Sequence, residues 1–180
     1  MIIPRESHNL TQDRSLIDRL WYKFFADFWA RFDRREQRPV VGQMYMQNNT
    51  TATVIADTTT FVKIAGTTVA GSYNNQYNHT NGRLTNAATY RRRFKVSVTG
   101  TMTAHKDDYI EFGVYDSAIG TVQVDSRIKM YIHHGTDPII FCTDAIVNHG
   151  IGDYVEVHLR DVTTVHNVTV ERLNVVVTEI

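Results

Sequence analysis

Five of the eight histidines are the residues best suited to metal chemistry, because a neutral imidazole nitrogen binds zinc and related cations. His133 and His134 are adjacent, and adjacent residues of a strand point to opposite faces, so they would bind one ion together only beyond a strand end. A site shared between subunits is one interpretation, and histidines of an ordinary surface or interface are the commoner one. We therefore predict no metal and no cofactor. The five histidines are His133, His134, His149, His158 and His166.

Three acidic residues close in the sequence could act as the paired carboxylates of a glycosidase: Asp107, Asp108 and Glu111. Asp107 and Asp108 fall in the stretch AHKDDY, where turn geometry alone favours acidic side chains. The chain also lacks the motifs of serine hydrolases, phosphate-binding loops, dinucleotide-binding loops and zinc proteases. We therefore expect a protein without catalytic residues and without enzymatic activity.

The overall charge argues against nucleic acid as a partner. Lys and Arg number 19, and so do Asp and Glu, whereas a nucleic-acid-binding domain usually carries a basic excess. No stretch reaches the roughly 18 uncharged apolar residues of a membrane-spanning helix, so we expect no membrane insertion. The single cysteine, Cys142, lies in the apolar run PIIFCTD, which predicts a buried thiol.

Most of the chain has the pattern of β-structure. From Gly42 onward, apolar and polar residues alternate in short runs, as on strands with one buried face. Turn-forming stretches such as NHTNG and HHGTDP separate the runs. In the last run the apolar residues change parity after Val170, which predicts a bulge near Arg172. The predicted strands cover residues 43–46, 52–56, 59–65, 94–104, 109–115, 127–133, 139–143, 153–161 and 168–177.

These runs follow one another without intervening helices, which predicts a mainly β fold, an antiparallel jelly-roll β-sandwich. One amphipathic α-helix precedes it. We therefore expect two parts: residues 1–41, an extended arm followed by the helix, and residues 42–180, the sandwich.

The predicted helix starts after a cap at Asp13 or Ser15 and ends near Gln37, ahead of Pro39. Its apolar side chains spread over roughly 200° of the helix circumference, and its opposite side mixes Asp with Lys and Arg. That mixture differs from the cationic face of a membrane-surface helix, so we favour docking onto protein over a membrane surface. The docking residues are Leu20, Trp21, Phe24, Phe25, Phe28, Trp29 and Phe32.

The outward faces of the predicted strands mix Tyr with His and paired charges. This composition is typical of a subunit interface, and the alternative is an ordinary half-solvated sheet face. The predicted interface residues are Tyr109, Tyr115, Tyr131, Tyr154 and His158.

A polar loop at residues 72–82 offers a second possible binding surface. Its aromatic and amide side chains could stack on and hydrogen-bond a sugar. The candidate ligand residues are Tyr73, Asn75, Tyr77 and His79.

Several stretches together carry a family resemblance: GQMYMQNNTTATVIA, FVKIAGTTVAG, NGRLTNAATYRRRFKVSVTGTMTA, IEFGVYD, GDYVEVHLRD and VTVERLNVVVTEI. In strand order and turn composition, residues 42–180 resemble the jelly-roll modules related to tumour necrosis factor and the complement globular head, as they occur in bacteriophage virion proteins. The resemblance implies a non-enzymatic homotrimer on the exterior of a virion.

We accordingly expect a head decoration or head-fibre protein that is anchored to the capsid through its N-terminal helix. The alternative is a tail-tip or tail-fibre protein that recognises a glycan or a protein on the host surface.

Overall fold

A computed structural model describes residues 23–26, 40–72 and 74–180 of the chain. The chain divides into two units, residues 1–38 and residues 39–180. In the first unit residues 23–26 are helical and exposed, and the rings of Phe24 and Phe25 meet edge to face with their centroids 5.7 Å apart. The other predicted docking residues, Leu20, Trp21, Phe28, Trp29 and Phe32, lie outside the described residues.

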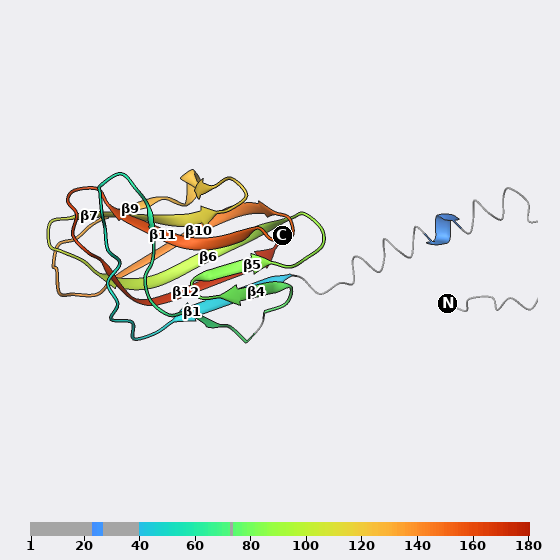
Figure 1. Ribbon diagram of the computed structural model, residues 1–180, viewed down its shortest axis with the longest axis horizontal. Helices are drawn as coiled ribbons and strands as arrows, with labels where there is room; N and C mark the ends of the chain where they lie inside the picture. Colours follow the sequence, from blue (N-terminus) through green and yellow to red (C-terminus); the bar gives the residue numbers. More distant parts are fainter. Residues whose placement is uncertain (1–22, 27–39, 73) are drawn as a thin grey trace, which may run out of the picture. The chain divides into compact units, whose positions relative to one another are not determined.

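The second unit is a sandwich of two antiparallel sheets (Figure 1), which confirms the predicted jelly-roll class. One sheet has five strands in the order β10-β6-β12-β1-β3. Its strands are β1 (Val41–Met46), β3 (Val69–Ala70), β6 (Arg92–Thr103), β10 (Ile139–His149) and β12 (Thr169–Glu179).

The other sheet has seven strands, with the order β4-β5-β11-β7-β8, and β2 and β9 pair with β11 and β7. These strands are β2 (Val62–Lys63), β4 (Tyr77–Thr80), β5 (Arg83–Asn86), β7 (Tyr109–Asp116), β8 (Thr121–Val122), β9 (Ile128–Tyr131) and β11 (Tyr154–Asp161). A short 3-10 helix, η1 (Val124–Ser126), precedes β9.

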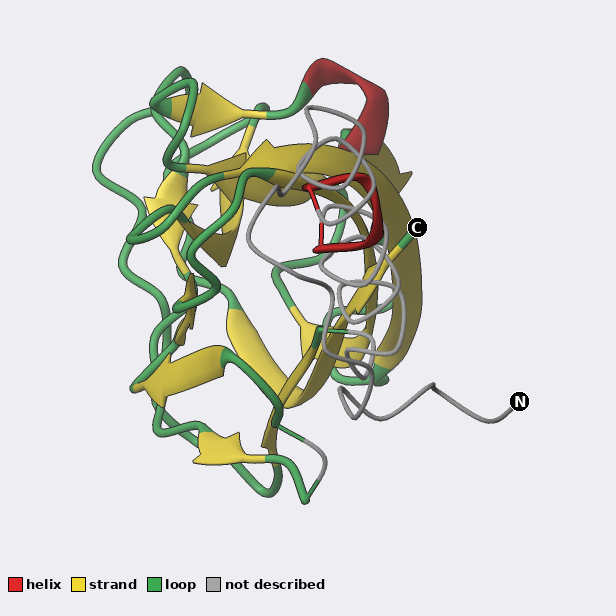
Figure 2. Cartoon of the chain, turned by 90° about the vertical axis from the view of Figure 1, so that its right-hand side faces the viewer, coloured by secondary structure: helices red, strands yellow, loops and turns green. Residues whose placement is uncertain are grey.

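The core lies between the two sheets, which face each other across it when the unit is viewed from the end nearest the C-terminus (Figure 2). Alternate residues of the long strands point into it, as the sequence pattern predicts. Burying such side chains stabilises the fold by roughly 1.5–3 kcal/mol each before ordering costs. Examples from facing strands are Phe94, Val96 and Val98 of β6 and Ile110, Phe112 and Val114 of β7.

The predicted bulge in the last strand is confirmed. The pairing of β12 with β6 shifts register between Val170 and Arg172, so that Glu171 is the extra residue. Val170 before the shift and Leu173 after it are therefore both buried, although their sequence parity differs.

Three other expectations were wrong. Residues 52–56 form only an isolated bridge at Thr53, and residues 59–65 contribute only β2. The carboxylate of Asp57 accepts hydrogen bonds from the backbone of Thr59 and Thr60, which turns the chain where a strand was predicted. Cys142 is exposed, because PIIFCTD alternates on β10 and places the thiol on the outward face.

The two ends of the sandwich are distinct. Val41 pairs with Thr178, so the chain enters the sandwich at the end where the C-terminus lies (Figure 1). Thr103 pairs with Thr169, which places the turn after β6 and the loop before β12 at the opposite end. We call this opposite end the distal end. Within the described ranges, no helix has the length and apolarity needed to cross a membrane.

Candidate functional site

The outward face of the seven-stranded sheet carries a cluster of charges around one buried carboxylate. One oxygen of Glu156 lies 3.0 Å from Lys63 Nζ and 3.0 Å from Arg83 Nε, and the other lies 2.9 Å from His158 Nε2. Burial alone would raise the pKa of Glu156, but hydrogen bonds from His158, Lys63 and Arg83 outweigh it and lower the pKa to about 2. Glu156 is therefore an anion at neutral pH, held by groups of its own chain.

Aromatic rings extend this cluster across β7 and β11. Tyr115 stacks on His158 with ring centroids 4.5 Å apart and on Tyr154 with centroids 6.1 Å apart. The guanidinium of Arg83 lies 3.7 Å from the centre of the Tyr154 ring. Further along the face, the centroids of Tyr109 and Tyr131 are 5.0 Å apart.

All five predicted interface residues thus lie on this one face, in two groups. Tyr115, Tyr154 and His158 form one group, and Tyr109 and Tyr131 form the other. Each of these side chains contacts another ring of the same chain, and Tyr109 and Tyr131 remain exposed. Their role at a subunit interface stays a prediction.

The carboxylates considered for glycosidase chemistry each have a partner of their own. Glu111 forms an ion pair of 2.6 Å with Arg160, and Asp107 accepts a hydrogen bond of 2.6 Å from the hydroxyl of Tyr131. Asp108 is buried and faces two histidines. Asp107 and Glu111 therefore act in structural pairs on this face.

The outward face of the five-stranded sheet differs in composition. Its edge strand β10 presents Ile140, Cys142, Ile146 and Asn148 to solvent, together with Asp144, which pairs with Lys95 of β6. Ile140 is 76% exposed and Ile146 is 56% exposed. The outer edge of β10 pairs with no strand of the described residues, which is the situation in which sheets recruit another chain.

A groove of about 570 Å³ lies on the same face. Ile140 borders it from β10, Tyr45 from β1, and Arg172 and Asn174 from β12. Ile140 borders this groove, and Ile146 lies further along the same exposed side of β10. We call the groove and these two isoleucines together the β10 surface.

The predicted ligand loop contains strand β4 and the turn that leads to β5. Tyr77 is buried, so its proposed role in stacking on a sugar is wrong. Its hydroxyl lies 3.1 Å from His149 Nδ1, and His149 Nε2 lies 3.0 Å from a carboxylate oxygen of Asp116 in the core. Burial raises the pKa of Tyr77, so its hydroxyl stays neutral and able to donate.

The other residues of this candidate set are also involved in the fold or lie outside it. His79 is half-buried and lies 2.8 Å from Thr68 Oγ1, and burial lowers its pKa. Asn75 exchanges two backbone hydrogen bonds with Val41. Tyr73 lies outside the described residues.

The five histidines considered as metal ligands do not converge. His149 lies in the core, His158 pairs with Glu156, and His133 packs edge-on against Tyr131. His134 belongs to none of these contacts. His166 instead lies beside His105 and Asp108. Together these three residues form the one group in the described residues whose donor atoms could hold a metal ion.

Comparison with known proteins relates the chain to others by fold. No protein-family model matches it, and no curated protein matches it in sequence. Murine APRIL matches with a TM-score of 0.52 and 5% identity over 78% of this chain and 99% of its own. Vertex protein P5 of phage PRD1 matches with a TM-score of 0.51 and 11% identity over 78% of this chain and 73% of its own.

The TNF protein Eiger of S. frugiperda also matches, with a TM-score of 0.47 and 13% identity over 79% of this chain and 94% of its own. At such low identities the likeness to APRIL and P5 concerns the fold alone. The chain therefore shares its jelly-roll fold with murine APRIL and with a vertex protein of a phage.

Proposed function

We propose that this protein is a non-enzymatic structural component of a phage virion, displayed on the outside of the particle as a homotrimer and anchored to the capsid through its N-terminal helix. The observation that carries the proposal is the fold shared with PRD1 vertex protein P5 over 78% of the chain. The family resemblance of residues 42–180 supports the trimeric state.

The β10 surface supports self-association. Two isoleucines more than half exposed on an edge strand are costly in water, and a second copy would remove them from it. On the opposite face, the main charged groups and the rings of Tyr115 and His158 are paired within the chain. We therefore place the subunit contact at the β10 surface.

Anchoring is assigned to the N-terminal helix because of its aromatic residues. Phe24 and Phe25 are exposed in the described part of the helix, and the sequence places five further large apolar residues around them. An apolar surface of this size suits a protein partner that covers it. The capsid is the partner that fits a virion component.

The alternative role in receptor binding depended on an exposed aromatic loop. The burial of Tyr77 in the core removes one of its aromatic side chains. We therefore favour assembly over glycan recognition.

Particle incorporation of helix variants tests the proposal. Phe24→Ala combined with Phe28→Ala removes two aromatic rings from the helix and should strongly reduce the number of copies per purified particle. Lys23→Ala combined with Asp27→Ala is the matched control, because it changes the polar side of the same helix and should leave incorporation unchanged. Unchanged incorporation of the Phe24 and Phe28 variant would show that the helix is not the anchor.

A further inference from the structure

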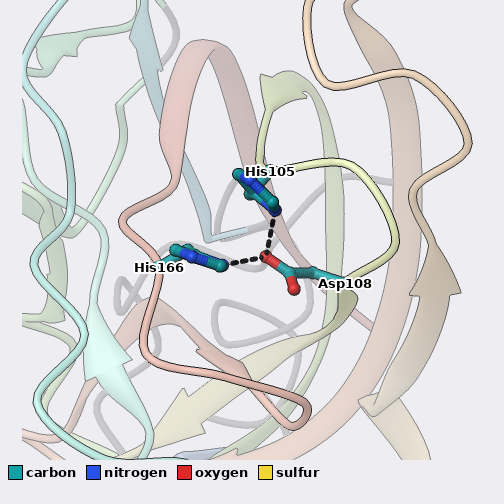
Figure 3. A group of neighbouring side chains, drawn as sticks. All are labelled: His105, Asp108 and His166. Carbon is teal, nitrogen blue, oxygen red and sulfur yellow. Dashed lines mark hydrogen bonds and ion pairs between the residues drawn. The ribbon is translucent and has the colours of Figure 1, made fainter.

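A compact group of metal-binding side chains lies at the distal end of the sandwich. His105 and Asp108 come from the turn between β6 and β7, and His166 comes from the loop between β11 and β12 (Figure 3). Both imidazole rings approach the same oxygen of Asp108 from different segments of the chain. The β-sandwich thus joins residues that are 58 positions apart in the sequence.

The donor atoms of this group lie nearly as close together as the ligand atoms around a bound metal ion. Asp108 Oδ2 lies 2.9 Å from His166 Nδ1 and 3.8 Å from His105 Nδ1, and the candidate donor atoms of all three residues lie within 4.8 Å of one another. Metal–ligand bonds of about 2.0–2.2 Å place neighbouring ligand atoms roughly 3.0–3.5 Å apart. Small side-chain rotations would therefore bring the three donors around one ion.

Neighbouring groups hold the carboxylate of Asp108 in place. Its other oxygen lies 2.9 Å from Thr164 Oγ1, and the same hydroxyl lies 3.0 Å from Oδ2 of Asp161. Asp161 is buried and accepts hydrogen bonds from the backbone of Thr163 and Thr164, which shapes the loop that carries His166. Such outer contacts orient metal ligands in known sites.

The charge balance of the group calls for a cation. Asp108 is only 3% exposed, and the hydroxyl of Thr164 links it to a second buried carboxylate, Asp161. In the described part of the chain, His105 and His166 are the ion-pair partners of Asp108, and neither Lys nor Arg forms an ion pair with either carboxylate. Buried carboxylates are normally paired with cations or bind metals.

We infer that His105, Asp108 and His166 bind one divalent transition-metal ion of the zinc class, which ties the β6–β7 turn to the β11–β12 loop. Two imidazole nitrogens and one carboxylate oxygen suit Zn²⁺, Co²⁺ or Ni²⁺, whereas Ca²⁺ and Mg²⁺ prefer oxygen ligands throughout. The imidazoles are 59% and 45% exposed, so an ion can enter from solvent and water can complete its coordination.

Metal titration of the full-length, chelator-treated protein tests the inference. We expect one Zn²⁺ per chain by isothermal titration calorimetry, a rise in the melting temperature with Zn²⁺, and visible absorption bands when Co²⁺ is used instead. Ca²⁺ and Mg²⁺ at the same concentrations should produce no binding heat and no change in melting temperature.

Variants identify the ligands. His105→Ala and His166→Ala alter exposed side chains, so they should fold normally and weaken Zn²⁺ binding by at least roughly tenfold. Thr164→Val keeps all three ligands and should weaken binding by roughly tenfold through the freed carboxylate of Asp108. His133→Ala and His134→Ala are controls at histidines outside the group, and their affinities should equal that of the unaltered protein.

Two results would overturn the inference. One is the absence of Zn²⁺ binding by the folded protein, and the other is binding that His105→Ala and His166→Ala leave intact. Neither result depends on the virion role, because the purified chain is measured without a particle. Loss of particle incorporation and loss of metal binding are therefore separate outcomes.

Discussion

At the scale of single residues, Glu156 shows how a buried charge is stabilised. Its carboxylate is removed from solvent, which by itself favours the neutral acid. Lys63, Arg83 and His158 supply enough hydrogen bonds to reverse that preference. The carboxylate of Glu156 therefore stabilises the fold in its ionised form and loses this effect when it is protonated.

This gives a prediction for acid unfolding. The folded pKa of about 2 lies below the ordinary value of 4.5, so the stabilisation is fully present above pH 4.5 and is lost as the pH falls toward 2. Glu156→Gln should lower the free energy of unfolding at pH 7 by roughly 2–3 kcal/mol. It should also flatten the change in stability between pH 4.5 and 2, measured by urea denaturation at a series of pH values.

Asp144→Asn is the matched control for this prediction. Asp144 pairs with Lys95 at the surface, where both side chains are about half exposed, so the change should cost less than about 0.5 kcal/mol. An equal loss of stability in both variants would mean that the Glu156 cluster has no special role.

At the scale of elements, the bulge in β12 is fitted to a glycine in the neighbouring strand. Gly100 pairs with Leu173 next to the register shift. A Cβ at Gly100 would lie 2.5 Å from Cζ of Phe141 and 2.6 Å from the backbone oxygen of Arg172. Because the second atom belongs to the bulged backbone itself, it cannot rotate away.

Gly100→Ala should therefore destabilise the sandwich by roughly 1–3 kcal/mol, measured by urea denaturation at neutral pH. Gly150→Ala is the control, since a Cβ there would meet no atom closer than 3.6 Å. Its stability should stay within about 0.5 kcal/mol of that of the unaltered protein. If Gly100→Ala lowered the free energy of unfolding no more than Gly150→Ala does, β6 and β12 would be able to move apart at the bulge without loss of stability.

The elements also show what the sequence could predict. Long strands with one buried face, such as β6 and β11, are predicted by the alternation of apolar and polar residues. The bulge near Arg172 is predicted by the change in parity of that alternation. Two-residue strands such as β3 and β8 are too short to show a period, because their pairing is decided by neighbours far along the chain. The β4–β5 hairpin looked like a loop because its strands are polar.

The group of His105, Asp108 and His166 is also hard to predict, because contacts between distant parts of the chain create it. Its three residues lie in a turn and a loop, and only the pairing of β6, β7, β11 and β12 brings them together. In the sequence His105 stands beside the charged turn residues Lys106, Asp107 and Asp108, and this pattern gives no sign of a metal site. The sequence predicts only a turn at Asp108, because its burial depends on the loop from β11 to β12.

At the scale of the whole molecule, the two outward faces of the sandwich differ in what they leave unpaired. The seven-stranded face has paired charges and stacked rings, while the β10 surface exposes isoleucine side chains and an edge strand. The trimer proposed above needs a contact surface, and this difference favours the β10 surface over the seven-stranded face. Lysine substitutions on each face, compared by their effect on the oligomeric state, distinguish the two surfaces.

Ile140→Lys combined with Ile146→Lys should convert a trimer into monomers, measured as native mass relative to the 20.7 kDa chain. Both side chains are mostly exposed in the single chain, so the variant should keep its fold while a charge prevents burial at the contact. Tyr109→Lys combined with Tyr131→Lys is the matched change on the opposite face and should leave the trimer intact. If only the tyrosine variant were monomeric, the contact would lie on the seven-stranded face, as the sequence predicts. If the unaltered protein were itself monomeric, the proposed trimer would be wrong.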